Sequence, residues 1–194
     1  MTFPTAKFQE VLFRGRKVPA ALVSCVEQPA IAALLAEHGF RWINPEELPS
    51  LLTNEYLSES ERANPDIASN VAATEVIMAK IAWFWEDDDG NLIGYWLGDD
   101  PELPATPIIV GYDTEGQFSC EGAVSLGDLI TYKRSFAEDD RYEELASECN
   151  AAGLTVTVPT LRAFYKVTCA INPNAMREAG YYAERVKRGL SGKA

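Results

Sequence analysis

Two aromatic-rich segments on either side of an Asp-Gly pair constrain the fold of this chain most. Residues 81–87 have the sequence IAWFWED and residues 91–97 have the sequence NLIGYWL, with Asp89-Gly90 between them. Asp-Gly between two apolar runs is the strongest short-range signal for a β-hairpin. With a two-residue loop, Trp85 pairs with Gly94 and Trp83 with Trp96. Aromatic side chains then occupy both faces, so one face is core and the other is covered by another element or by a partner.

The rest of the chain adds a second hairpin and several helices. Residues 108–113 and 117–121 flank the turn Thr114-Glu115-Gly116 and predict that hairpin. Apolar periodicity and capping residues predict helices over 29–38, 44–52, 66–79, 125–132, 138–152 and 172–190. Residues 53–64 are expected to be a polar connector, residues 154–158 a strand, and residues 1–65 an N-terminal helical part. These elements predict an α+β fold over residues 1–194, a single domain whose largely antiparallel sheet is backed by helices.

The last predicted helix has an apolar stripe, which we expect to face the core. The stripe consists of Met176, Ala179, Ala183, Val186 and Leu190, with basic residues on its flanks.

Charge is unevenly distributed along the chain, whose formal net charge is −12. Residues 1–20 hold four basic and one acidic side chain, and residues 160–194 hold seven basic and two acidic ones. Residues 21–159 hold the remaining six basic and 26 acidic side chains, a net charge of −20. Such an acidic chain is not expected to bind nucleic acid, because Lys and Arg supply most of the affinity for phosphates. A basic protein is the complementary partner.

The compartment predicted from the sequence is the cytoplasm. No run approaches the roughly 20 apolar residues of a transmembrane helix, so no membrane is expected. Residues 14–25 resemble a lipoprotein signal only poorly, since the apolar stretch is short and contains Pro19. Cys25, Cys120, Cys149 and Cys169 form no Cys-x-x-Cys pair, and we expect reduced, mostly buried thiols.

Equipment for catalysis is scarce in this sequence. His38 is the single histidine and is expected at the end of a helix, and no Gly-x-Ser-x-Gly segment or phosphate-binding glycine loop is present. The acidic stretch before Gly90 does not match an EF-hand, because Trp85 stands where the first calcium ligand would be. We therefore expect no enzyme, no metal site and no cofactor. A small enzyme of unknown reaction remains the third hypothesis for the function.

A run of motifs from the first hairpin onward carries a resemblance to a known family. The motifs are Trp83-Phe84, Asp89-Gly90-Asn91, Gly94-Tyr95-Trp96-Leu97, Ile108-Ile109, Tyr112-Asp113-Thr114-Glu115-Gly116 with Phe118, and Ser125-Leu126 with Asp128-Leu129. This order of aromatic hairpin, strand, acidic turn and Ser-capped helix resembles the SUKH superfamily, which includes bacterial immunity proteins and the yeast cell-wall assembly regulator. The resemblance implies an α+β domain that acts by binding a protein. For bacterial members that protein is typically a toxin, often a nuclease, neutralised in the cytoplasm.

Acidic bursts around the first hairpin define the predicted partner-binding site. Its charged residues are Glu86, Asp87, Asp88, Asp89, Asp99 and Asp100, and Trp96 is the candidate aromatic anchor. The leading hypothesis is an immunity-type protein that neutralises a basic toxin. A regulatory or scaffolding domain that binds a cellular protein is the alternative. The sequence does not indicate an oligomeric state.

Overall fold

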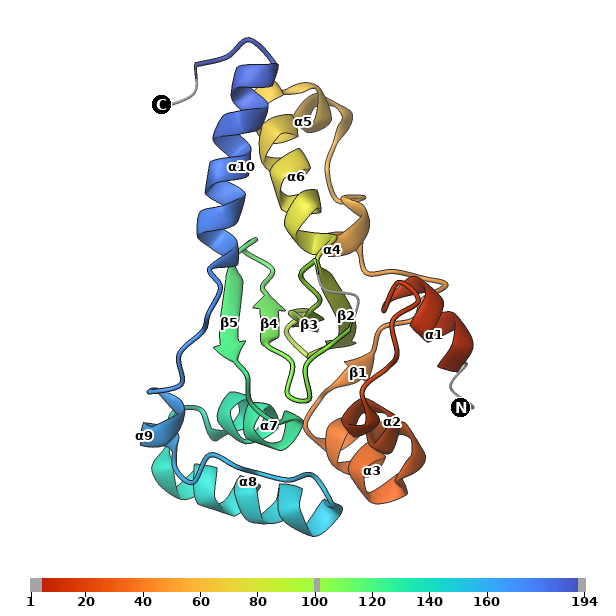
Figure 1. Ribbon diagram of the computed structural model, residues 1–194, viewed down its shortest axis with the longest axis vertical. Helices are drawn as coiled ribbons and strands as arrows, with labels where there is room; N and C mark the ends of the chain where they lie inside the picture. Colours follow the sequence, from red (N-terminus) through yellow and green to blue (C-terminus); the bar gives the residue numbers. More distant parts are fainter. Residues whose placement is uncertain (1–4, 100–101, 192–194) are drawn as a thin grey trace.

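A five-stranded antiparallel sheet with the strand order β1-β2-β3-β4-β5 is the centre of the computed structural model, which describes residues 5–99 and 102–191 (Figure 1). The strands are β1 (Arg41–Trp42), β2 (Ile81–Glu86), β3 (Leu92–Trp96), β4 (Ile109–Tyr112) and β5 (Phe118–Gly122). The helices are α1 (Thr5–Val11), α2 (Ala20–Glu27), α3 (Pro29–Glu37), α4 (Ser50–Thr53), α5 (Glu59–Ala63), α6 (Pro65–Met78), α7 (Leu126–Ser135), α8 (Asp139–Ala152), α9 (Leu161–Phe164) and α10 (Pro173–Lys187). The predicted α+β class with an antiparallel sheet is confirmed.

Helices gather at both ends of the sheet. In Figure 1, α5, α6 and α10 extend beyond one end, and α2, α3, α7, α8 and α9 lie around the other. The predicted positions of α3, α6, α7, α8 and α10 are confirmed. Within the described residues, no single helix has the length and apolar composition needed to cross a membrane, and α2 with α3 passes only as a pair bent by 88°.

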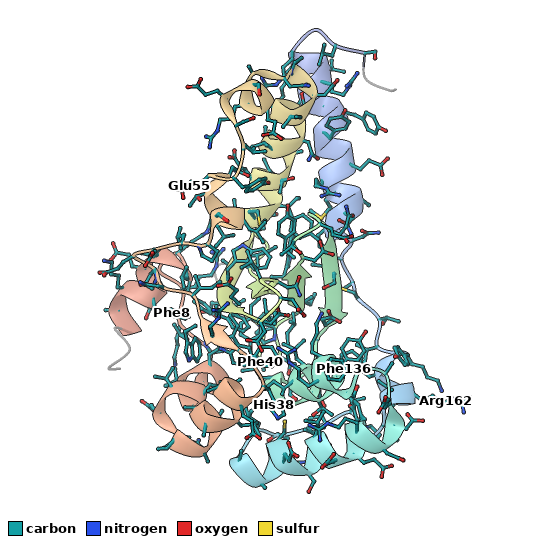
Figure 2. The ribbon with its side chains drawn as sticks, turned by 180° about the vertical axis from the view of Figure 1, so that it is seen from behind. Phe8, His38, Phe40, Glu55, Phe136 and Arg162 are labelled. Atoms are coloured by element: carbon teal, nitrogen blue, oxygen red, sulfur yellow. A yellow bond between two sulfur atoms is a disulfide. The ribbon has the colours of Figure 1, made fainter. Side chains whose placement is uncertain are left out.

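The aromatic hairpin lies in the core. Trp83, Phe84 and Trp85 are all at most 4% exposed. The N-terminal part of the chain packs against them, since the ring centroid of Trp42 is 5.6 Å from that of Trp85 and Phe40 is 5.4 Å away. Figure 2 shows Phe40 directly after the end of α3, where the chain enters β1. Residues before position 65 thus contribute to the same core as the sheet.

The register predicted for the first hairpin is wrong. Glu86 pairs with Leu92 and Trp83 with Gly94, with an irregularity between Trp83 and Trp85. The loop has three residues instead of two, because the Asp87 N–H donates to the Asn91 carbonyl at 3.0 Å. The extra loop residue shifts the pairing by one position, and the bulge shifts it by another.

Two local predictions before α6 are wrong. The helix expected over 44–52 is a turn followed by the single turn of α4, because Asn44 accepts the Glu46 N–H at 3.0 Å and Pro49 disfavours helix before it. The connector expected over 53–64 contains α5. Its capping box was missed: the Ser58 N–H donates to the Glu61 carboxylate at 2.8 Å, and Ser58 Oγ accepts the Glu61 N–H.

The strand expected over 154–158 is instead an extended segment bound to a buried side chain. The backbone N–H groups of Thr157 and Val158 donate to Asp128 Oδ1, both at 2.7 Å. Asp128 also caps α7, since its Oδ2 accepts the Ser125 N–H at 3.0 Å. The carboxylate therefore accepts the backbone hydrogen bonds that a neighbouring strand would otherwise accept.

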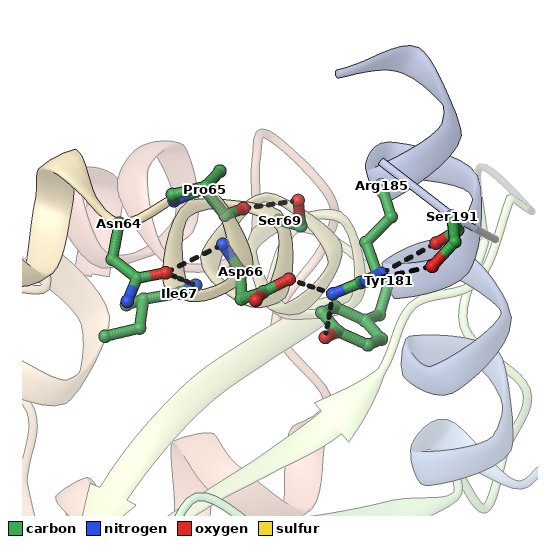
Figure 3. A network of polar contacts seen from close by, with 8 residues as sticks. All are labelled: Asn64, Pro65, Asp66, Ile67, Ser69, Tyr181, Arg185 and Ser191. Atoms are coloured by element: carbon green, nitrogen blue, oxygen red, sulfur yellow. Dashed lines mark hydrogen bonds and ion pairs between the residues drawn. The ribbon is translucent and has the colours of Figure 1, made fainter. Parts of the chain in front are cut away.

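The apolar stripe of α10 faces solvent, contrary to the prediction. Met176 is 38% and Val186 is 61% exposed, and Pro173 is the one residue of α10 that is fully buried. The opposite side packs on α6, where a Cβ on Gly180 would lie 3.3 Å from the Ala73 Cβ. Arg185 Nη1 pairs with Asp66 and also donates to the Tyr181 hydroxyl at 3.0 Å (Figure 3). A close backbone approach and an ion pair decide which face of α10 is covered.

The expectation of four reduced thiols is wrong for two of them. Cys120 in β5 and Cys169, which precedes α10, form a disulfide with a Cα–Cα distance of 6.0 Å. Cys25 and Cys149 are free and buried, as expected. The disulfide fastens the segment that leads into α10 to the outer strand of the sheet.

Candidate partner-binding site

The first loop, residues 87–91, is held by the side chain of Asp87. Asp87 is only 5% exposed, and its carboxylate accepts the N–H groups of Asp89 and Asn91 at 3.0 Å each. It also accepts the Asn91 side-chain amide at 3.1 Å. Gly90 completes the loop with a φ of +79°, a conformation that favours glycine. Asp87, predicted as a partner contact, is thus turned inward and shapes the loop.

The other three acids of the first burst remain at this end of the hairpin. Asp88 and Asp89 are exposed, and the side chain of Glu86 is 31% exposed, with its Oε1 3.6 Å from Arg41 Nη2. Asp88 lies against the end of α3, because a Cβ on Gly39 would be 1.8 Å from Asp88 Oδ2. The first loop therefore presents two exposed carboxylates on a fixed backbone.

The remaining predicted site residues lie at the opposite end of the hairpin. Trp96 pairs with Ile81, whereas Glu86 pairs with Leu92, so the strands separate the two groups by about 16 Å. The Asp99 side chain is 90% exposed and pairs with Lys80 at 2.8 Å. Trp96 is half-buried and packs on the core, and Asp100 lies outside the described residues. The structure does not bring Asp99 and Trp96 together with the first loop.

A polar cleft of about 660 Å³ adjoins the first loop. The turn ends of the first and second hairpins, the α4 region, α6 and α10 contribute to it. Its aromatic, charged and hydroxyl-bearing lining residues include Tyr56, Glu86, Tyr112, Thr114, Glu115 and Arg177. Tyr56 is 56% exposed, whereas Tyr112 is buried. Burial raises the pKa of Tyr112, so its phenol is neutral at physiological pH. The cleft thus combines two aromatic rings with two carboxylates.

The second loop, residues 113–117, repeats the construction of the first. Asp113 Oδ1 accepts the Gln117 N–H at 2.8 Å, and the Gly116 N–H donates to the Asp113 carbonyl at 3.0 Å. The two loops are adjacent, because a Cβ on Gly90 would lie 3.4 Å from the Thr114 methyl carbon. Both loops have the pattern Asp-x-x-Gly, and the two middle positions of each are exposed.

The single cation that lines this cleft is committed to the second loop. Arg177 Nη1 donates to the Gly116 carbonyl, its Nη2 donates to Gln117 Oε1 at 3.3 Å, and the guanidinium lies 5.9 Å from the centre of the Phe118 ring. Glu86 and Glu115 have no such backbone partners among the contacts described. Since Glu86 also pairs with Arg41, Glu115 is the carboxylate of this cleft without a cationic partner among the contacts described.

Of the predicted site residues, Glu86, Asp88 and Asp89 stay together at the first loop, and the sequence patterns did not predict that Tyr56, Tyr112 and Glu115 line the cleft beside them. The signal for Glu115 was present, since Asp113 to Gly116 repeats the spacing of Asp87 to Gly90. Tyr56 lines the cleft because of the way the segment after α4 packs, and no local sequence pattern predicts that packing.

The single histidine is structural in this arrangement. His38 Nε2 lies 3.3 Å from Glu148 Oε2, and only 9% of the His38 side chain is exposed. This contact joins the end of α3 to α8 and agrees with the helix-end position that was predicted. In the described part of the chain, no three His, Cys, Asp or Glu side chains come together in a way that could hold a metal ion.

Comparisons with protein-family models, with curated proteins and with solved structures find no match for this chain.

Proposed function

We propose that this protein is an immunity-type member of the SUKH superfamily, which binds a basic bacterial toxin and neutralises it by protein contact. The sequence resemblance suggests the family and the toxin, and one structural observation supports a basic protein partner: two loops present exposed acids beside a cleft that contains two tyrosines. Asp88, Asp89 and Glu115 provide charge, and Tyr56 provides an exposed ring. Tyrosine is enriched among the residues that dominate binding energy at protein interfaces.

The same geometry suggests how binding would neutralise the toxin. A Lys or Arg side chain of the toxin enters the cleft between Glu86 and Glu115 and lies against Tyr112 or Tyr56. Acidic residues accelerate association with a basic protein, because opposite charges steer the encounter. If the toxin is a nuclease, the loops occupy the basic surface that would otherwise bind phosphates.

We place this encounter in the cytoplasm, where a nuclease would reach its substrate. The Cys120–Cys169 disulfide favours a second candidate, the binding of a protein outside the cytoplasm, because disulfides persist mainly in oxidising compartments. Thiol trapping in intact cells separates the two: reduced Cys120 and Cys169 support the cytoplasm, and an oxidised pair supports an extracytoplasmic partner.

A regulatory or scaffolding domain would use the same loops on a cellular protein. Capture with the full-length protein from its native cell, followed by a low-salt wash, discriminates between the two. A basic protein encoded beside this gene, toxic when expressed alone, supports immunity. A non-toxic cellular protein supports regulation.

The site itself is tested with charge variants and the captured toxin. Replacing both Asp88 and Asp89 by Asn should weaken binding at least tenfold and flatten its salt dependence, because the variant loses two exposed carboxylates. The matched control replaces Asp139 and Asp140 by Asn, which removes two exposed acids from the start of α8. Calorimetric titration at several salt concentrations measures both.

Equal weakening in the two variants would show that total charge, and not the loops, drives association. Unchanged binding in the D88N/D89N variant would remove the first loop from the interface. Protection of cells that co-express the toxin gives an independent readout of neutralisation.

A further inference from the structure

A second cavity, distinct in character from the acidic cleft, has a volume of about 320 Å³. It lies among α1, α4, α6 and the first half of β2. Its wall is mainly aliphatic and includes Leu12, Leu48, Leu51, Leu52, Met78 and Ile81. Small-molecule sites are mostly apolar cavities of about 300 Å³ or more in which a few polar groups converge.

Trp83 places an unused hydrogen-bond donor at this cavity. The side chain lines the cavity and is 4% exposed, and its Nε1 is buried without a hydrogen-bond partner among the described residues. Burying a polar group without a partner costs free energy, so a buried indole N–H in a cavity wall points to an acceptor that comes from elsewhere.

Arg14 adds positive charge to the same cavity. It is exposed, and within the described residues its guanidinium makes no hydrogen bond or ion pair. Partial burial, and then the neighbouring Arg16, lower the pKa of Arg14. Arg16 is thus a second positive charge close to Arg14. Glu75 also lines the cavity, but its Oε1 accepts a hydrogen bond from Asn54 Nδ2 at 3.1 Å.

We propose that this cavity binds a small aliphatic carboxylate. The carboxylate accepts the Trp83 N–H and is neutralised by Arg14, and the alkyl chain packs on the leucine side chains. Because one water molecule occupies about 30 Å³ of liquid, the cavity holds about ten non-hydrogen atoms, the number in octanoate. This site is separate from the two loops and does not depend on the proposed function.

Titration of the ¹⁵N-labelled full chain with octanoate tests the proposal through the indole signals. We expect a saturable shift of the Trp83 indole N–H, which the W83F variant identifies by its absence. Trp85 is an internal control, because its Nε1 is also buried without a partner but it does not line the cavity. Octanol and octylamine should bind roughly tenfold more weakly, since they cannot offer an anionic acceptor.

The R14Q variant tests the charge at an exposed position, where folding is not at risk. It should bind octanoate about tenfold more weakly than the wild type, whereas R141Q, which removes a partly exposed cation from α8, should bind equally well. The proposal fails if no saturable shift occurs, if the Trp85 signal moves as much as that of Trp83, or if R14Q binds like the wild type.

Discussion

At the scale of single residues, Asp128 shows how far local patterns reach. It is 0% exposed, and its capping of α7 was predictable from the Ser125-x-x-Asp128 spacing. Its other partners, Thr157 and Val158, lie 29 and 30 residues further along the chain. No local sequence pattern connects them, so a segment that looks like a strand by composition is held by one carboxylate instead. Asp87 differs, because its partners Asp89 and Asn91 lie within four residues of it.

Replacing Asp128 by Asn should lower the free energy of unfolding by about 3 kcal/mol. Both oxygens of the Asp128 carboxylate accept hydrogen bonds from backbone N–H groups. The asparagine side chain has an NH2 group in place of one oxygen, so some of those donors would lose their acceptor. Urea denaturation of D128N against the wild type measures the loss. The control is D140N, an exposed acid, for which a change within about 0.5 kcal/mol is expected. A loss below 1 kcal/mol in D128N would contradict the account of the buried carboxylate.

At the scale of elements, periodicity located helices well but did not decide which face they bury. The bounds predicted for α6 and α8 from their apolar spacing agree with the structure to within one residue at each end. The face of α10 was predicted wrongly, because Gly180 permits a close approach to α6 that an apolar stripe does not encode. Similarly, the first hairpin was predictable but its register was not, since the carboxylate of Asp87 selects a three-residue loop.

Replacing Gly180 by Leu should destabilise the protein by about 1–3 kcal/mol. Even a Cβ at this position approaches Ala73 closely, so a larger side chain forces α10 away from α6. Its exposed neighbour supplies the control, since A179L places the same side chain toward solvent. Thermal unfolding of both variants measures the difference. If A179L loses as much stability as G180L, the packed face of α10 has been assigned incorrectly.

At the scale of the whole molecule, the disulfide links two parts of the chain that differ in charge, the acidic middle and the basic C-terminal segment. The acidic middle was visible in the sequence, but the fold splits its bursts between the two ends of the first hairpin. The basic C-terminal segment is tied back to the sheet by Cys120 and Cys169, a linkage that their spacing alone did not reveal. Charge totals therefore predict a basic partner, but they do not indicate which end of the hairpin it would contact.

Replacing Cys120 by Ser should lower the free energy of unfolding by about 4 kcal/mol under non-reducing conditions. The disulfide joins residues 49 positions apart, and losing that constraint enlarges the conformational entropy of the unfolded chain. Dithiothreitol should lower wild-type stability to the level of the variant and leave C120S unchanged. If the urea midpoint of the wild-type protein is the same with and without the reductant, the disulfide contributes nothing to the free energy of unfolding.

The two Asp-x-x-Gly loops separate the positions that folding needs from those that it does not. Asp87, Gly90, Asp113 and Gly116 set the backbone, and Asp88 and Thr114 lie against neighbouring segments. Asp89 and Glu115 are exposed, so selection for a new partner can act on these two positions at little cost in stability. Such an arrangement lets recognition change rapidly over generations while the scaffold stays constant, which suits a protein whose target itself evolves.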